Sequence, residues 1–269
     1  MKASGMMTPE QRYWFDLTGY LHLKQVLQGD EFLRVQEAVD RYLKAPPETL
    51  PDGYRIRDKE YHHAIGFDRS LDALAVHPAT WPIIREFTNG RPQMSGSGVV
   101  CNERGEGALP LHCARDDFGF DATRYEFRDG HILCNDFVVF FYLSEVRPGD
   151  GGLLLVPGSH KSALSRPPEM FHGGEIDNDI PPGVVNITPD AGDVVIFSEL
   201  TTHGVIAWRP QDRRRRMVNY RYKTQQRGYE HRYTPVIKAL LPPELVQLVS
   251  DEDYMHKKKI AEADVVELS

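Results

Sequence analysis

The chain has few cysteines, no long apolar run and no excess of positive charge, and each absence excludes a class of protein. Cys101, Cys113 and Cys134 are an odd number without paired spacing, which argues against a disulfide framework and for the cytoplasm. No stretch approaches the roughly 18 apolar residues of a membrane span, and Met1 to Thr8 has no apolar signal core. The 32 Lys and Arg against 39 Asp and Glu give a net charge of −7, which does not attract a nucleic acid polymer. A soluble protein without a membrane or nucleic acid partner is expected, and its oligomeric state stays open.

The first part of the chain, residues 1–90, carries mostly helical patterns. Thr8 stands before a proline, which predicts a helix that begins there and runs to Asp16. Asp30 is expected to cap a second helix, and Trp81–Phe87 is expected to form another. Tyr20 to Leu27 reads as a short strand. These segments predict a helical support for the rest of the chain.

From residue 91 to about 225, short apolar runs alternate with Gly- and Pro-rich turns. Such spacing is typical of a β-sandwich or barrel. The strands are expected at Met94–Cys101, Leu133–Leu143, Gly152–Val156, Val184–Ile187, Val194–Phe197 and Met217–Tyr222. No repeat or linker interrupts the chain, so residues 1–269 are expected to form a single domain with a C-terminal extension, 226–269, that ends in a solvated helix. The predicted fold class is mainly β with flanking helices.

Two of the 11 histidines stand in a context that suggests chemistry. His203 follows the turn and apolar strand of residues 192–198, and His112 follows the Met94–Cys101 strand and a Gly-rich turn. Each is expected at the rim of a barrel, where inward side chains converge. They are 91 residues apart, so only the tertiary structure can bring them together.

Three motifs in the same order resemble the phytanoyl-CoA dioxygenase family over about residues 8–225. They are the segment Asp150–Lys161 with its Pro-Gly-Ser-His turn, the strand Gly192–Phe197 followed by His203, and the run Arg213–Arg216. The resemblance implies a double-stranded β-helix, also called a jelly roll, that uses Fe(II), 2-oxoglutarate and O2. It implies that His203 is the distal metal ligand and that His112, which stands 45 residues before Pro157, is the proximal one.

The same resemblance implies residues for 2-oxoglutarate. Arg214, eleven residues after His203, would pair with the C5 carboxylate, for which the guanidinium fork is well shaped. Arg215 is the alternative, because neighbouring strand residues face opposite sides. Asn135 could bond the C1 carboxylate or a substrate, or could be a satisfied amide at a strand end.

The chain departs from the family at the proximal motif. The family has His-x-Asp, whereas this sequence reads His112-Cys113-Ala114, and an alanine side chain cannot bind metal. Alanine here resembles the halogenase-type members, in which chloride takes the vacated coordination position and chlorine is transferred to the substrate. The resemblance therefore predicts a chlorinase that acts on an unactivated C–H bond of a small molecule.

Three alternatives remain at this stage. Asp116 or Asp117 could reach the third position and give a hydroxylase, or two histidines and 2-oxoglutarate could support hydroxylation without a chloride. The chain could also be a jelly-roll binding protein without catalysis.

The substrate is indicated only by arginines and aromatics between residues 115 and 128. A barrel opening lined by such side chains would suit a nucleotide or another phosphorylated metabolite. The same segment also fits a loop whose aromatics pack on the barrel and whose arginines pair with neighbouring acids such as Glu126.

Overall fold

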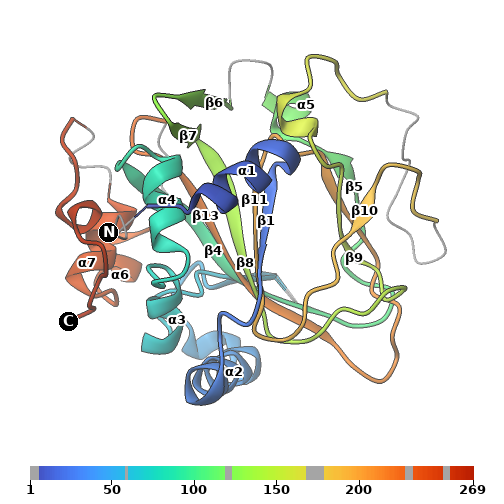
Figure 1. Ribbon diagram of the computed structural model, residues 1–269. Coiled ribbons are helices and arrows are strands. Elements are labelled where there is room, and N and C mark those ends of the chain that lie inside the picture. The colour runs from blue at the N-terminus through green and yellow to red at the C-terminus, as the bar shows by residue number, and fades with distance from the viewer. Residues whose placement is uncertain (1–5, 58–59, 119–122, 168–178, 228–232, 251–254) are drawn as a thin grey trace.

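The structure is a computed structural model that describes residues 6–57, 60–118, 123–167, 179–227, 233–250 and 255–269. In these residues a large and a small antiparallel sheet face each other, with helices on the far side of the large one (Figure 1). The large sheet has the order β1-β11-β8-β13-β4-β3-β2, the small sheet the order β10-β9-β12-β5, and β6 pairs with β7. This is the mainly β, double-stranded β-helix type of architecture that the sequence predicts.

The strands of the large sheet are β1 (Tyr20–Leu23), β2 (Arg55–Arg57), β3 (Glu60–His62), β4 (Pro92–Asn102), β8 (Asp136–Tyr142), β11 (Val194–Ser198) and β13 (Arg215–Thr224). Those of the small sheet are β5 (Leu109–His112), β9 (Gly152–Leu155), β10 (Val185–Asn186) and β12 (His203–Ile206), and the hairpin consists of β6 (Tyr125–Arg128) and β7 (His131–Cys134). The helices are α1 (Pro9–Thr18), α2 (Gly29–Lys44), α3 (Arg69–Leu74), α4 (Trp81–Phe87), α5 (Ala114–Phe118), α6 (Pro235–Lys238) and α7 (Pro243–Val249). Short 3₁₀ helices cover Pro47–Thr49, Ser159–Lys161 and Lys259–Glu262.

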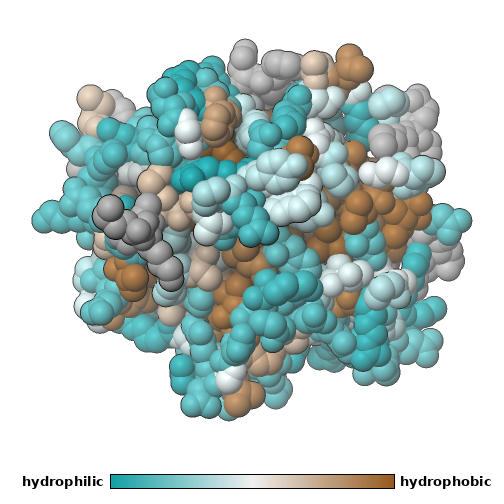
Figure 2. All heavy atoms as spheres, in the orientation of Figure 1, coloured by the Kyte–Doolittle hydropathy of each residue, from teal (hydrophilic) through white to brown (hydrophobic). Residues whose placement is uncertain are grey.

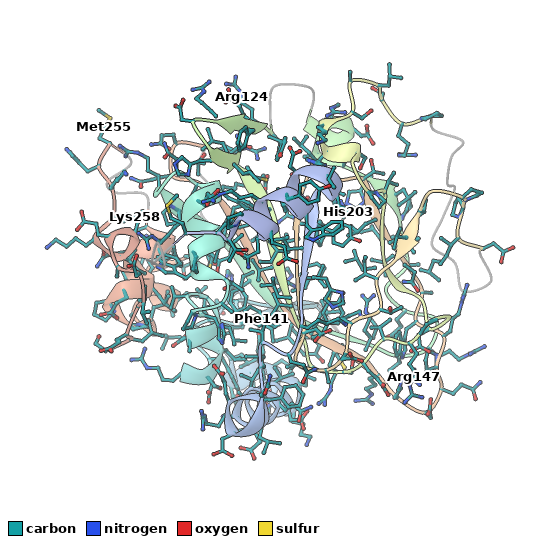
Figure 3. All side chains as sticks on the ribbon, viewed as in Figure 1. Arg124, Phe141, Arg147, His203, Met255 and Lys258 are labelled. Carbon is teal, nitrogen blue, oxygen red and sulfur yellow. The ribbon has the colours of Figure 1, made fainter. Side chains whose placement is uncertain are left out.

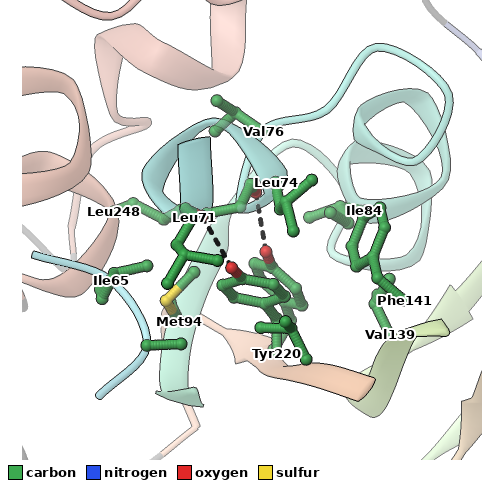
Figure 4. Packing of buried hydrophobic residues seen from close by; sticks show 14 of the residues in the cluster. Ile65, Leu71, Leu74, Val76, Ile84, Met94, Val139, Phe141, Tyr220 and Leu248 are labelled. Carbon is green, nitrogen blue, oxygen red and sulfur yellow. Dashed lines mark hydrogen bonds between the residues drawn. The ribbon is translucent and has the colours of Figure 1, made fainter. Parts of the chain in front are cut away.

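Helices α2, α3 and α4 pack on the outer face of the large sheet through one apolar cluster. Tyr220 and Tyr222 of β13 extend into this cluster, where their hydroxyls donate hydrogen bonds of 2.7 Å to the carbonyls of Leu71 and Ala75 (Figure 4). These bonds satisfy two buried phenol hydroxyls, which would destabilise the fold if they were buried without a partner. They also tie α3 to the strand that carries the arginine run.

The inner face of the large sheet packs against the small sheet through a second cluster, which includes Val138, Leu155, Phe197 and Met217. Inward and outward side chains alternate along β13, so Met217 faces the small sheet while Val218 faces the helices. A residue that shares the face of Met217 or pairs with Leu155 therefore lies in the space between the sheets.

The helix boundaries follow local sequence signals in two cases and not in a third. Thr8 forms a capping box with Gln11 at the start of α1, and α4 spans the predicted Trp81–Phe87. Asp30 is not a cap, because α2 begins at Gly29 and its N-cap, Gln28, makes no side-chain bond to the helix.

Three predictions about the rest of the fold are corrected by the structure. The strand predicted at Tyr20 to Leu27 is shorter, as β1 covers Tyr20–Leu23, and β2 and β3, which also extend the large sheet, were not predicted. The predicted strand Leu133–Leu143 is divided between β7 and β8, and β5, β6 and β12 were not predicted as strands. The end of the chain is not a solvated helix in residues 255–269, since Ile260 and Ala261 are buried in a 3₁₀ turn.

On the face shown in Figure 2 hydrophilic side chains predominate, and apolar side chains gather beside β9 and β10. Val185 of β10 is 39% exposed and contributes to this area. Among the described residues, no helix is both long enough and apolar enough to cross a membrane.

Candidate functional site

His112 and His203 lie directly opposite each other on neighbouring strands of the small sheet. They are register partners in the β5–β12 ladder, and their ring centroids are 4.2 Å apart. His203 also pairs with Leu155 of β9, whose side chain lies between the sheets. Directly paired residues share a face of the sheet, so both imidazoles face the interior. Figure 3 shows His203 on the small-sheet side of the molecule and Phe141 near the helices.

Both rings are held by the same kind of hydrogen bond. The Nδ1 of His112 lies 2.9 Å from the carbonyl oxygen of Pro110, and the Nδ1 of His203 lies 2.7 Å from that of Thr201. A carbonyl oxygen only accepts, so each Nδ1 carries the proton and donates it. The neutral ring then keeps a lone pair on Nε2, which is the form that binds a metal ion.

The surroundings of His203 keep it neutral. Its ring is buried and packs against Phe197 at a centroid distance of 4.9 Å. Burial lowers the pKa of His203, opposed by the nearby carboxylate of Glu199. At neutral pH the imidazole is therefore available as a ligand without first losing a proton.

Within the described residues, no third His, Cys, Asp or Glu stands with these two in an arrangement that would already hold a metal ion. Ala114, where the sequence resemblance leads one to expect a carboxylate, is 2% exposed at the start of α5. Its amide donates a hydrogen bond of 2.8 Å to the carbonyl of Glu199, which joins α5 to the segment before His203.

Asp116 pairs with an arginine in the structure. Its Oδ2 lies 3.5 Å from Nη2 of Arg166, and Asp116 is exposed. The side chain of Asp117 lies outside the described part of the chain.

The four arginines of the run 213–216 differ sharply in their surroundings. Arg214 is exposed and its Nη2 lies 2.6 Å from Oε1 of Glu103. Arg213 packs over Trp208 and pairs with Asp150, and Arg216 pairs with Asp40. Arg215 is 4% exposed. It lies two residues before Met217 on β13 and therefore faces the space between the sheets.

Arg215 and Tyr142 are a buried, unsatisfied pair of donors. Among the described residues, the Nε of Arg215 and the hydroxyl of Tyr142 have no hydrogen-bond partner. Burial lowers the pKa of Arg215 and raises that of Tyr142 to about 12. An unpaired buried guanidinium is costly unless it meets an anion. Its position fits a carboxylate such as that of 2-oxoglutarate, and the two unprotonated Nε2 atoms fit Fe(II).

Asn135 stands between β7 and β8 and has another partner. Its Oδ1 accepts a hydrogen bond of 2.7 Å from the amide of Arg124. This is the satisfied strand-end amide that the sequence left as an alternative to a 2-oxoglutarate contact.

Glu199 is the residue of this site that sequence reasoning missed. Its side chain is 6% exposed, and its Oε2 lies 3.9 Å from Nε2 of His203. Arg221 lies 2.8 Å from the other carboxylate oxygen of Glu199. The available signal was an acidic residue four positions before His203, directly after an apolar strand.

A second buried acid lies beside this ion pair. Asp136 of β8 is held by Arg227 at 2.6 Å and lies 3.9 Å from Arg221. Burial raises the pKa of Asp136 to about 6. The cluster thus contains two acids and two arginines.

A model of the family described as phytanoyl-CoA dioxygenase (PhyH) matches residues 15–217 of the chain. This span contains both histidines, Ala114 and Arg215. Curated protein sequences give no match.

Several solved structures have a similar fold. HygX from Streptomyces hygroscopicus, with nickel and 2-oxoglutarate bound, is 20% identical, with a TM-score of 0.65 over 81% of this chain and 88% of its own. EctD from S. alaskensis, with 2-oxoglutarate and 5-hydroxyectoine, is 17% identical, with a TM-score of 0.65 over 86% and 80%. The epimerase SnoN from nogalamycin biosynthesis is also 17% identical, with a TM-score of 0.58 over 85% and 87%. At these identities the likeness concerns the fold.

Proposed function

Because the chain belongs to the phytanoyl-CoA dioxygenase family, we propose that it is an Fe(II)- and 2-oxoglutarate-dependent oxygenase that hydroxylates a C–H bond of a small molecule. The observation that carries the proposal is the facing pair His112 and His203, each with Nδ1 bonded to a carbonyl and Nε2 left as a ligand. Bound iron with 2-oxoglutarate would supply the activation of O2 for attack on the C–H bond.

His112 and His203 would hold the iron, and the sheet supports this role. Both are fixed by the backbone register and by a carbonyl on the far ring nitrogen, so metal binding needs little reordering. Arg215 would bind the distal carboxylate of 2-oxoglutarate, and the hydroxyl of Tyr142 would donate to the same group. Arg214 is a weaker candidate because it lies in solvent and already pairs with Glu103.

Chlorination is the second candidate, and one specific observation favours it. Ala114 leaves the family carboxylate position without a ligand, which could admit chloride. Against it, the Glu199 carboxylate lies 3.9 Å from the coordinating nitrogen of His203 and would repel an anion that bound beside it. This charge favours hydroxylation.

The substrate is proposed to be a small molecule. Among the similar structures, HygX is also known with hygromycin B bound and SnoN with nogalamycin RO. A phosphorylated substrate has less support in this chain than an uncharged one. Arginines of the segment 115–128 that could bind a phosphate pair with acids instead, and Arg128, for example, lies 2.6 Å from Glu126.

Anaerobic addition of Fe(II) and 2-oxoglutarate tests the proposal. The unmodified protein should develop a visible metal-to-ligand charge-transfer band, which requires both to bind. His203→Ala should abolish the band, and the exposed His131→Ala should keep it. The absence of a band in the unmodified protein would refute both the hydroxylase and the chlorinase.

Chloride separates the two candidates before a substrate is known. If chloride enters the coordination sphere, titrating it should shift the band and tighten or weaken 2-oxoglutarate binding. We expect no shift in the unmodified protein. A saturable shift specific to chloride would favour the chlorinase.

A further inference from the structure

The residue next to the candidate iron position that the family pattern does not explain is Glu199. It follows β11 and stands on the connection to β12, four residues before His203. A carboxylate that is 6% exposed must be compensated, and here one oxygen is paired with Arg221 at 2.8 Å. The other oxygen, Oε2, lies on the side of His203.

The carboxylate of Glu199 lies within a small side-chain movement of the distance that two adjacent ligands of one metal ion need. Ligand atoms about 2.1 Å from one metal lie about 3.0 Å apart when adjacent and about 4.2 Å apart when opposite. The Oε2 of Glu199 and the Nε2 of His203 are 3.9 Å apart, about 0.9 Å more than two adjacent ligand atoms. A shift of about 1 Å in the carboxylate brings it to an adjacent position, and side-chain rotation supplies such a shift without moving the sheet.

The backbone places Glu199 beside the position that lacks its usual carboxylate. The amide of Ala114 donates to the carbonyl of Glu199 at 2.8 Å, so the two residues are neighbours although 85 positions separate them. The alanine methyl leaves room there. An aspartate at 114 would bring a second negative charge close to Glu199, which is unfavourable without a metal.

Arg221 holds one oxygen of the Glu199 carboxylate in place. Its guanidinium pairs with Oε1 and also lies 3.9 Å from Asp136, whose own partner is Arg227. The ion pair with Arg221 orients the Glu199 carboxylate and leaves Oε2 outside it.

We propose that Glu199 is the third protein ligand of the iron, in place of the aspartate of the His-x-Asp motif. The carboxylate reaches the metal from the β11–β12 connection, and the Ala114 methyl makes the space for it. This inference rests on the proposed function. The site is then a centre of two histidines and one carboxylate, in which the carboxylate comes from the segment before His203 and not from the residue after Cys113. Chloride would find no vacant protein-ligand position there.

Metal affinity tests the inference without turnover. Ni(II) binding is measured by calorimetry in the unmodified protein, in Glu199→Gln and in Asp116→Asn, which removes the other nearby carboxylate. Glu199→Gln should weaken Ni(II) binding by about 100-fold, while Asp116→Asn should stay within about threefold.

A rescue variant separates loss of a ligand from loss of fold. In Ala114→Asp/Glu199→Gln the carboxylate returns at the family position, and Ni(II) affinity should recover to within about tenfold of the unmodified protein. The chloride response gives a second readout: with Fe(II) and 2-oxoglutarate, chloride should shift the charge-transfer band of Glu199→Gln but not that of the unmodified or the double variant.

The outcomes distinguish the two proposals. If the unmodified protein binds Ni(II) and Glu199→Gln binds it equally well with the same chloride response, the Glu199 inference is wrong and the proposed function stands. If Glu199→Gln is weak and the double variant is equally weak although folded by circular dichroism, the ligand role is also wrong. If the unmodified protein binds neither Ni(II) nor Fe(II), both proposals fail.

Discussion

His203 and His112 are register partners across two antiparallel strands, with ring centroids 4.2 Å apart, although they are 91 positions apart in the chain. The ladder, rather than any local motif, sets this relationship. Backbone carbonyls hold both rings through their Nδ1 atoms. Substitutions that disturb these carbonyls should therefore weaken metal binding, and substitutions elsewhere on the surface should not.

Two adjacent arginines should behave differently. Arg215→Met should raise the 2-oxoglutarate concentration that half-saturates the charge-transfer band by about 100-fold, because a buried charge-assisted pair contributes about 2–3 kcal/mol. Arg214→Met should leave it within about twofold, since Arg214 is exposed and pairs with Glu103. The reverse ranking would place 2-oxoglutarate elsewhere.

The same variant should stabilise the protein without ligand. Arg215 is buried, and within the described residues no acid pairs with it, so methionine removes an uncompensated charge. We expect Arg215→Met to raise the free energy of unfolding by about 1 kcal/mol, measured in urea. Added 2-oxoglutarate with Ni(II) should then raise Tm in the unmodified protein and far less in the variant. A lower urea stability of Arg215→Met would contradict an uncompensated charge.

Acid should destabilise the protein through His160. Burial lowers the pKa of this imidazole from 6.5 to about 4, so the unfolded chain binds the proton more readily. The stability that depends on a neutral His160 is complete above pH 6.5 and is lost as the pH falls toward 4, by about 3 kcal/mol. His160→Asn should flatten this limb of the Tm-against-pH curve, whereas the exposed His131→Asn should not. An unchanged acid limb in His160→Asn would assign the loss to other groups.

Gly19 should be intolerant of a side chain for reasons beyond its backbone angle. It has a φ of +79°, and a Cβ there would lie 2.4 Å from Oγ1 of Thr201 and 2.5 Å from Nδ1 of His160. Thr201 also holds His203 through its carbonyl, so Gly19→Ala should weaken Ni(II) binding as well as lower the free energy of unfolding by about 3 kcal/mol.

Gly130 is the control, because its φ is +78° and nothing lies within 4 Å of the point where a Cβ would stand. Gly130→Ala should cost about 1 kcal/mol and leave metal binding unchanged. Equal effects of the two substitutions would exclude the contact with Thr201.

Local signals in the sequence predicted much of the fold. The Thr8 cap, the Trp81–Phe87 helix and most strands of the jelly roll depend on neighbours within a few residues, and the structure contains them. The strands that were missed, such as β5 and β12, are short, and partners far along the chain define them. Strand β3 was missed for the same reason, because it is defined by its pairing with β4, about 40 residues further along the chain.

The sequence by itself determined the residue types of the site: the two histidines, the alanine in place of an aspartate, and a run of arginines of which alternation allows only some to face inward. Only the tertiary structure decided that Arg215 is buried while Arg214 is exposed, and that Glu199 lies beside His203. The physical reason is strand register. A shift of one residue turns every side chain to the other face, and the hydrogen bonds that set the register join segments far apart in the chain.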